Sequence, residues 1–378
     1  MRKDRFSPAY EMKRVIYPVG LGAFCRERFF STADRTVVFD MIYDCGSRSG
    51  MGSNIRKEIR TYYQNKPIDL VCISHFDDDH INEFRKLLGT KYIQPGRTTI
   101  LMPQIVGIDK VLVEIGVDEY VNYNTLKETL KERQFKIVEV SPQPEENIER
   151  IEVRKENFSE MNGTIYSGTQ IAILDGLWEY IPFNNFDKTY NSRLLSSLKS
   201  KTGFTDQQLK AIREGQASKK DIETLKTAYG KLGKTHNNVT FINRNSLQLL
   251  SKACYLVHSG AYIKYDPVMY QYAFGPIYYA LHSSCMYTGD SAMEMMMVAI
   301  KNKYLRHEDL GLFQIPHHGS THCYNQRVID NMHFHAAFVN TDLKSITMAP
   351  EVIDWQNNNI PALFMALVGE GVICEHIY

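Results

Sequence analysis

The chain has 378 residues, which exceeds the usual size of one compact domain but suits one large α/β domain that carries an insertion. A hydrophobic content of 43%, with 23 tyrosines and 18 phenylalanines, excludes a disordered chain, because that much apolar surface can build a substantial core. The net charge of +1 gives no overall attraction to nucleic acid or membranes, so a site for a polyanion would have to be a local basic patch.

The first predicted elements alternate between strands and helices. Two β-rich segments, RVIYPVGLGAF (14–24) and RTVVFDMIYDCG (35–46), precede a helical stretch, SNIRKEIRTYYQNK (53–66). The segment IDLVCIS (68–74) is apolar enough to be a buried strand, and HINEFRKLL (80–88) has the spacing of an amphipathic helix. The HFDDDH sequence between them therefore lies on a turn after a strand, where α/β proteins commonly assemble sites.

The sequence pattern changes near residue 144, from alternating strands and helices to an acidic stretch followed mainly by helices. Strand patterns at 91–104 and 135–144 flank a predicted helix, YNTLKETLKERQ (123–134). An acidic stretch and a tyrosine-containing strand, TQIAILDGLWEYIPF (169–183), then lead into helices across 189–232. We expect an inserted lobe at 144–235, mainly helical, within a domain formed by residues 1–143 and 236–378.

The second half of this lobe is basic. Residues 193–234 contain ten Lys or Arg against four acids, a balance of +6. N-cap spacing at Thr205 with Gln208, and at Ser218 with Asp221, divides the region into at least two helices. A solvated helical face is the commonest explanation of such a balance, and a lobe that contacts a polyanion is the alternative.

Strand patterns resume in the last third of the chain. They comprise NSLQLLS (245–251), YLVHSGAYIKY (255–265), IYYALHSSCMYTGD (277–290), LGLFQIP (310–316) and HAAFVNTD (335–342). Helices are predicted at 291–305 and 350–358.

The cysteines and the N-terminus indicate the compartment. Seven scattered cysteines, with no C-x-x-C pair, indicate reduced thiols and not a disulfide framework or a zinc ribbon. No apolar segment of a signal peptide is present near the N-terminus, and no window approaches 18 consecutive apolar residues. We expect a cytoplasmic protein with no membrane partner.

The HFDDDH turn offers four candidate metal ligands. Alternate residues of a tight turn project the same way, so His75 and Asp77 can converge on one point, and Asp79 and His80 on a neighbouring one. Carboxylates this close repel one another, whereas a divalent cation favours their ionised forms. The alternative is an acidic N-cap on the following helix.

Two distant segments favour the metal site over the N-cap. Asp290 in YTGDSA and the pair His317 and His318 in FQIPHHGS each follow a predicted strand, so their side chains can converge with the HFDDDH turn.

These segments together resemble a metallo-β-lactamase-fold hydrolase, in particular the metal-dependent domain of bacterial DNA-uptake competence proteins. PVGLGAF resembles the opening V-G-x-G strand of that branch, YDCG its Asp-x-Gly turn and SHFDDDH its H-x-H-x-D-H signature. RNSLQLL and YTGD resemble its N-S-L strand and G-D turn, and PHHGS is the most diagnostic element. The resemblance spans residues 15 to 355 without most of 144–235, and it implies a four-layer αββα sandwich with a mainly helical insertion.

The resemblance also implies two divalent metal ions and a role for each matching residue. The implied ligands are His75 and Asp77 for the first metal, Asp79 and His80 for the second, Asp290 as the bridge and His317 on the second metal. Asp79 or Asp290 would orient the attacking water or accept its proton, and Asp44 would orient the ligand turn. His318 would be a substrate contact, a general acid or a structural residue.

The sequence departs from the family pattern at the first metal position. Asp77 stands where the signature has a second histidine, and this harder ligand favours manganese or iron relative to zinc. Asn243 lies near the place of another absent histidine, with His236 as the nearest substitute, and Thr347 stands where the branch has a further histidine.

The expected reaction is hydrolysis by a metal-activated water. G-x-S-x-G and P-loop patterns are absent, so neither a serine nucleophile nor triphosphate binding is expected. A phosphodiesterase or nuclease that acts on nucleic acid or nucleotides is the leading hypothesis. The alternatives are a carboxylic ester, lactone or amide hydrolase, and a regulatory protein of a bacterial defence system that docks a protein partner through the 144–235 lobe.

Overall fold

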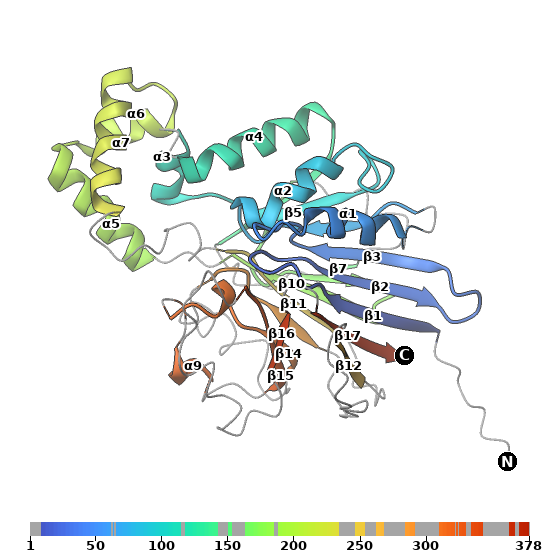
Figure 1. Ribbon diagram of the computed structural model, residues 1–378. Coiled ribbons are helices and arrows are strands. Elements are labelled where there is room, and N and C mark those ends of the chain that lie inside the picture. The colour runs from blue at the N-terminus through green and yellow to red at the C-terminus, as the bar shows by residue number, and fades with distance from the viewer. Residues whose placement is uncertain are drawn as a thin grey trace, which may run out of the picture.

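The protein is a mixed α/β structure in which two multi-stranded sheets face each other (Figure 1). The computed structural model describes residues 9–61, 63, 66–114, 118–142, 150–152, 163–184, 188–233, 246–253, 262–267, 284–291, 310–321, 323, 325–329, 334–342, 363–366 and 370–377.

The first sheet has nine strands and joins both ends of the chain. Its order is β12 (Tyr262–Pro267), β17 (Glu370–Ile377), β1 (Tyr10–Ile16), β2 (Cys25–Ser31), β3 (Val37–Tyr43), β4 (Leu70–Cys72), β5 (Thr99–Pro103), β6 (Lys136–Ser141) and β8 (Gly163–Tyr166). The pairs from β12 to β3 are antiparallel, and those from β3 to β8 are parallel. Strand β17 lies between β12 and β1, so segments from both sides of the predicted lobe build one sheet.

The second sheet has eight strands. Its order is β16 (Leu363–Ala366), β15 (Phe334–Asn340), β14 (Leu310–Gln314), β13 (Cys285–Tyr287), β11 (Gln248–Ala253), β10 (Trp178–Phe183), β9 (Gln170–Ile173) and β7 (Arg150–Glu152). The strands from β16 to β13 are parallel, so β13 and β14 end at the same edge of the sheet.

Two apolar layers hold these elements together. One lies between the sheets, where Phe29 packs edge-on against Trp178 and Tyr43 stacks on Tyr287. The other lies between the nine-stranded sheet and helices α1 (Gly52–Thr61), α2 (Asp78–Leu87), α3 (Gly107–Glu114) and α4 (Asp118–Glu132). Strand β4 contributes Val71 to the second layer and its neighbours to the first, which explains why that segment is apolar throughout.

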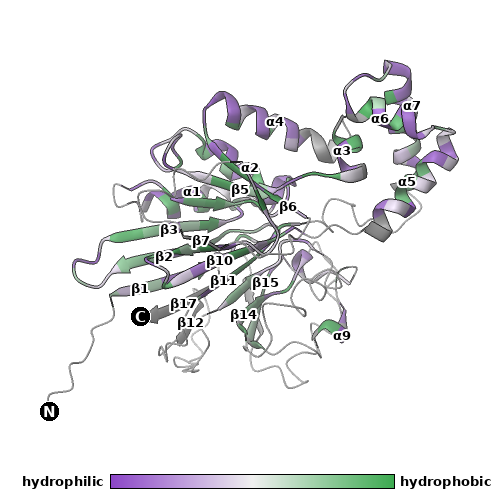
Figure 2. Ribbon diagram, turned by 180° about the vertical axis from the view of Figure 1, so that it is seen from behind, coloured by the Kyte–Doolittle hydropathy of each residue, from purple (hydrophilic) through white to green (hydrophobic). Residues whose placement is uncertain are grey.

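Hydropathy follows these layers. Figure 2 shows apolar residues along the strands and hydrophilic residues on the outer helices such as α4. The predicted helix at 350–358 and all but the first residue of that at 291–305 lie outside the described residues. Helix α9 (Gln326–Ile329) lies on the side of the eight-stranded sheet (Figure 1).

The helical lobe is smaller than the sequence predicts. Strands β7 to β10, which fall within 144–235, belong to the two sheets, because residues 178–183 are buried throughout. Only α5 (Lys188–Thr202), α6 (Asp206–Arg213) and α7 (Lys219–Gly233) stand apart at one end of the molecule (Figure 1). Their apolar residues join the layer that contains α3, so the lobe is anchored on the main body.

The predicted caps of the lobe helices are confirmed. Thr205 and Gln208 form a capping box at the start of α6, and the Ser218 hydroxyl accepts a hydrogen bond from the Asp221 backbone at 3.1 Å. Among the helices that the structure describes, none has both the length and the apolar character that a membrane crossing needs.

Candidate metal centre

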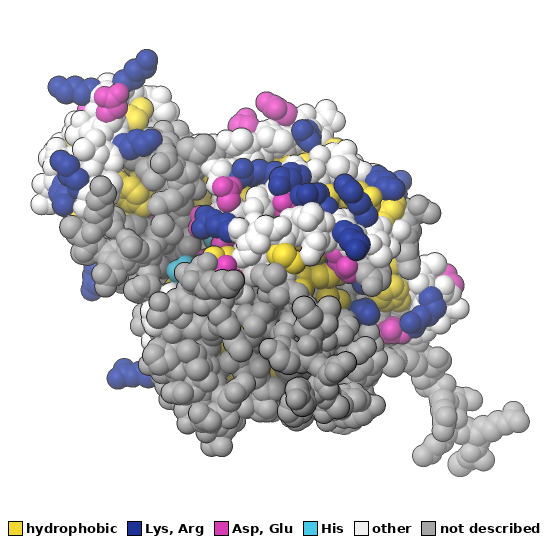
Figure 3. Space-filling view, viewed as in Figure 1, with side chains coloured by type: hydrophobic (Ala, Val, Ile, Leu, Met, Phe, Trp, Pro, Cys, Tyr) yellow, Lys and Arg dark blue, Asp and Glu magenta, His cyan; other side chains and the backbone are white. Residues whose placement is uncertain are grey.

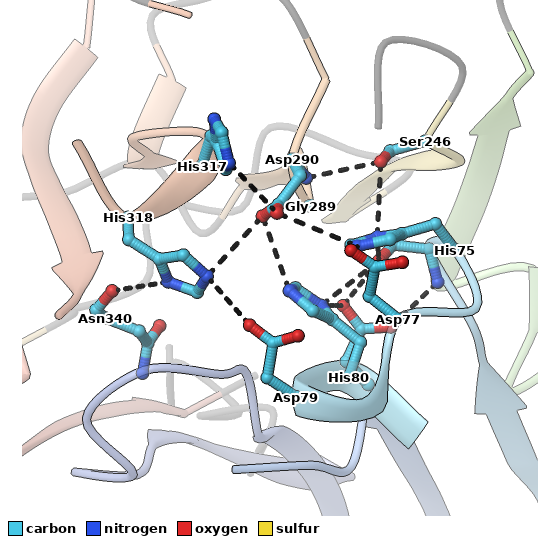
Figure 4. Close-up of polar contacts among 12 residues, drawn as sticks. His75, Asp77, Asp79, His80, Ser246, Gly289, Asp290, His317, His318 and Asn340 are labelled. Carbon is cyan, nitrogen blue, oxygen red and sulfur yellow. Dashed lines mark hydrogen bonds and ion pairs between the residues drawn. The ribbon is translucent and has the colours of Figure 1, made fainter. Parts of the chain in front are cut away.

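A cluster of histidines and aspartates lies where strands of both sheets end. His75 follows β4, Asp290 follows β13, and His317 and His318 form the short helix η3 (His317–Gly319) after β14. Asp79 and His80 lie in the first turn of α2. Figure 4 shows these side chains pointing toward one another. The predicted convergence of three distant segments is therefore present in the structure.

Glycines let the backbone approach the start of α2 closely. A Cβ on Gly46 would lie 2.4 Å from the Asp79 carbonyl oxygen, and one on Gly22 would lie 2.6 Å from the same atom. The backbone N–H of Cys45 donates to the His80 carbonyl at 2.8 Å. The two glycine turns noted in the sequence thus fix the position of the HFDDDH turn, and a side chain at either glycine would displace it.

Asp290 occupies the centre of the cluster. Its Oδ1 lies 3.4 Å from His80 Nε2 and 3.8 Å from His318 Nε2. Its Oδ2 lies 3.7 Å from both His75 Nε2 and His317 Nε2. Each carboxylate oxygen therefore faces a different pair of imidazoles, which is the arrangement that a bridging ligand requires.

Three of these histidines are oriented by contacts at Nδ1, on the side of the ring that faces away from the centre of the cluster. His80 Nδ1 donates to Asp44 Oδ2 at 2.8 Å, and His318 Nδ1 donates to the Asn340 carbonyl at 2.9 Å. His75 Nδ1 lies 2.9 Å from Ser74 Oγ, whose hydroxyl donates to Asp44. This network assigns the proton to Nδ1 in each ring and leaves the Nε2 lone pair facing the centre.

The Nε2 atoms of the same three rings have no hydrogen-bond partner among the described residues, although all three are buried. Burying such atoms without partners costs free energy unless a ligand satisfies them. Donor atoms on a tetrahedral metal, each at about 2.0–2.2 Å, lie about 3.3–3.6 Å apart. The 3.4 Å separations of Asp290 from His80 and of Asp79 from His318 match this spacing, so the residues fit a divalent metal.

Two sets of donors could hold an ion, and because both include His80, whose Nε2 has one lone pair, His80 can serve only one of them at a time. The first set is His75, His80 and Asp290, and the second is Asp79, His80 and His318. All members are buried and their donor atoms lie within 4.8 Å of one another within each set.

Charges inside the cluster shift the pKa values of its members. Burial, reinforced by the charge of His80, lowers the pKa of His75 to about 4. Burial also disfavours the charged form of His80, but Asp290 and Asp44 raise the pKa of His80 well above its ordinary value. Burial alone would raise the pKa of Asp290, yet the surrounding imidazoles, His80 foremost, hold it well below. Protons on imidazole balance the carboxylates here, and a divalent cation can replace those protons.

Asp77 lies at the margin of the cluster. Its Oδ2 is 3.8 Å from His75 Nε2, and its side chain is 18% exposed, so it belongs to neither donor set. Asp77 occupies the N-cap position of α2, but its side chain makes no capping hydrogen bond, so the N-cap alternative does not explain it. Asp78 points outward, with 55% of its side chain exposed and Arg85 Nη2 at 3.0 Å.

The two neighbouring histidines of the HHG turn differ in their position relative to the donor sets. His318 Nε2 lies 3.4 Å from Asp79 Oδ2, which puts it in the second donor set. His317, the residue that the resemblance assigns to the second metal, lies outside both sets, and its Nδ1 is 3.2 Å from Cys323 Sγ. Among the described residues, the structure thus favours His318 as the second histidine beside His80.

Sequence reasoning missed the residues that orient the rings. Ser74, Ser246 and Asn340 contact histidine Nδ1 atoms directly, Ser246 Oγ at 3.3 Å from His75. The position of Ser74 beside His75 and of Asn340 at a strand end was the only available signal. Asn243, His236 and Thr347 lie outside the described residues.

Comparison with known proteins adds no family. No protein-family model matches the sequence, and no curated protein matches it. The function therefore has to be argued from the cluster itself.

Proposed function

We propose that the protein is a metal-dependent hydrolase of the metallo-β-lactamase fold, with a dinuclear site, that cleaves phosphodiester bonds in nucleic acid or nucleotides. The observation that carries the proposal is the convergence of three buried, unsatisfied Nε2 atoms on both oxygens of Asp290. The order of the motifs along the chain and the two facing sheets support the fold. Five described cysteines are free thiols, which supports a cytoplasmic location.

The roles of the chain's own residues follow from their geometry. Two divalent ions would supply Lewis acidity and an activated water. His75, His80 and His318 would hold the ions through Nε2, and Asp290 would face both positions. Asp79, whose Oδ2 is near His318, is suited to orient the water or accept its proton. Asp77, at the margin of the first donor set beside His75, would add a hard oxygen ligand, which would favour manganese or iron over zinc at that position.

The helical lobe supports a phosphate-bearing substrate. A groove of about 550 Å³ lies between α5 and α7 and is lined by three lysines, Lys201, Lys220 and Lys231, against one acid, Glu223. Lys220 and Lys231 are eleven residues apart, so they share one face of α7. Figure 3 shows basic side chains on the lobe and a histidine at the surface on the same side of the molecule.

Metal content and substrate choice test the activity. Protein grown with manganese, iron or zinc should retain up to two equivalents of metal by ICP-MS. It should hydrolyse bis-p-nitrophenyl phosphate and leave p-nitrophenyl acetate and lactones intact. The variant Asp79→Ala/His80→Ala should lose this activity while its circular dichroism spectrum is unchanged. Absence of stoichiometric metal, or the reverse substrate pattern, contradicts the proposal.

A second experiment tests the role of the lobe. Lys220→Glu/Lys231→Glu should weaken binding of single-stranded DNA and lower the slope of log K against log salt by about 1–2. Lys210→Glu is the matched control, because Lys210 is also on the lobe but lies beside Glu214 and outside the groove. Equal loss of DNA affinity in both variants would mean that the lobe attracts DNA only through its net positive charge and not through the groove. Unchanged DNA binding would favour a protein partner at this surface.

A further inference from the structure

Arg48 borders the candidate metal centre on its open side. Its Nη2 lies 3.5 Å from Asp79 Oδ1, and 56% of its side chain is exposed whereas Asp79 is 7% exposed. It is therefore a positive charge that faces both the buried carboxylate and the solvent from which a substrate arrives.

The turn that carries Arg48 is fixed from several sides. The Arg48 backbone N–H donates to the Leu21 carbonyl at 2.8 Å. The Ser47 hydroxyl donates to the Val19 carbonyl at 2.7 Å, and the Ser49 hydroxyl donates to Asp342 at 3.0 Å. Asn82 of α2 donates to the Ser47 carbonyl at 2.8 Å. The base of the Arg48 side chain is thus held in place relative to the centre, which reduces the ordering cost of binding.

The guanidinium retains donors for a ligand. A guanidinium has five N–H donors, and within the described part of the chain the ion pair of Arg48 is with Asp79 alone, at a distance beyond an ordinary hydrogen bond. A guanidinium also binds two oxygens of a phosphate side by side, which an ammonium cannot do.

We infer that Arg48 binds a non-bridging phosphate oxygen of the substrate and selects anionic diesters over neutral esters. The inference rests on the proposed function and specifies its substrate charge. None of the family motifs in the sequence includes this residue.

Substrates that differ in charge but share a leaving group test the inference. Bis-p-nitrophenyl phosphate carries one negative charge, and diethyl p-nitrophenyl phosphate carries none. Arg48→Ala should raise KM for the diester about tenfold or more and change KM for the triester less than twofold. Arg48→Lys should recover part of the loss, because it restores the charge but not the paired donors. The matched control is Arg85→Ala, since Arg85 pairs with Asp78, the neighbour of Asp79 in the first turn of α2.

A binding measurement gives a readout that does not depend on turnover. Isothermal titration of the purified, metal-loaded protein with inorganic phosphate should show a Kd about tenfold higher for Arg48→Ala and unchanged for Arg85→Ala. An Arg48→Ala protein that binds phosphate like the wild type overturns the inference.

Failure of the proposed function would look different. If the wild type holds no metal and hydrolyses neither ester, that function fails, and the same phosphate titration with the metal-free wild type and Arg48→Ala still decides the role of Arg48. If Arg48→Ala impairs diester and triester equally, Arg48 acts by positioning Asp79, and charge selection is wrong.

Discussion

Two buried polar clusters in this protein differ in how their atoms are satisfied. The first lies between the sheets, where Arg14 and Glu27 are fully buried. The Glu27 carboxylate accepts hydrogen bonds from Arg14 Nε at 2.6 Å, the Tyr287 hydroxyl at 2.7 Å, the Tyr180 hydroxyl at 2.9 Å and Ser251 Oγ at 2.8 Å. No polar side-chain atom of these five residues lacks a partner in the described structure.

The second cluster is the candidate metal centre, where the outward-facing Nδ1 atoms are satisfied and the inward-facing Nε2 atoms of three rings are not. Both clusters are buried and charged, so burial and charge alone do not distinguish a structural network from a site. The difference is that every buried polar side-chain atom of the first cluster has a hydrogen-bond partner, whereas the second cluster has unsatisfied Nε2 atoms that converge on one point. We conclude that the first cluster has the pattern of a structural network and the second has the pattern of a ligand site.

The largest expected effect concerns Asp290. The variant Asp290→Asn removes the carboxylate whose two oxygens face both histidine pairs. Because Asp290 belongs to the first donor set and no other carboxylate in the described structure faces both pairs, the protein should lose at least one metal equivalent by ICP-MS and its hydrolysis should fall to background. Circular dichroism is the control for folding. A folded Asp290→Asn protein with two metals would contradict the assigned bridge.

The reverse pattern is expected in the cluster between the sheets. Glu27→Ala leaves the Arg14 guanidinium buried without its carboxylate, which should lower the free energy of unfolding by about 3–5 kcal/mol. Metal content should remain unchanged, because Glu27 belongs to neither donor set. Urea unfolding followed by fluorescence measures the loss. The double variant Arg14→Met/Glu27→Leu should be less destabilised than Glu27→Ala, and equal losses would show that packing, not the unpaired charge, is responsible.

The sequence predicted those parts of the site that depend on local spacing. His75, Asp79 and His80 fall within one strand–turn–helix unit, so their convergence follows from the period of that unit. Asp78, between Asp77 and Asp79, points outward and pairs with Arg85. Asp44 follows the adjacent parallel strand β3, and its support of His80 follows from that neighbouring strand end.

Features that depend on backbone conformation or on distant pairing could not be predicted. His317 and His318 both have positive φ, 51° and 56°, so the choice of the inward ring depends on a turn whose shape the sequence does not specify. Asn340 supports His318 from another strand end. Strands β8 and β10 fall within the range expected for the lobe, but β8 pairs with β6 and β10 pairs with β11, so both sheets extend into that range.

An intermediate effect is expected at Asp44, which lies outside both donor sets but orients one of their rings. Asp44→Asn removes the negative charge beside the His80 Nδ1 proton and turns one oxygen that accepts hydrogen bonds into an amide nitrogen that donates them. Metal affinity should fall about 10–100-fold in a chelator competition assay. Asn tolerates the positive φ of 54° at this position, so the backbone is unstrained and the variant should fold. Unchanged affinity would mean that the Nδ1 contact does not control the centre.

The smallest expected effect is a pH-dependent contribution of Asp77 to metal affinity. Burial, with the charges of Asp79 and Asp290, raises the pKa of Asp77 to about 6. Only the ionised carboxylate binds a metal, so the contribution of Asp77 is present at pH 7 and is lost as pH falls through 6. Asp77→Asn should therefore bind metal more weakly than the wild type at pH 7. The ratio of the two Kd values should fall about tenfold between pH 7 and pH 5, as titration calorimetry can measure. Protonation of His80 affects both proteins equally and cancels in the comparison. A ratio of Kd values that stays constant from pH 7 to pH 5 would show that Asp77 is not a ligand.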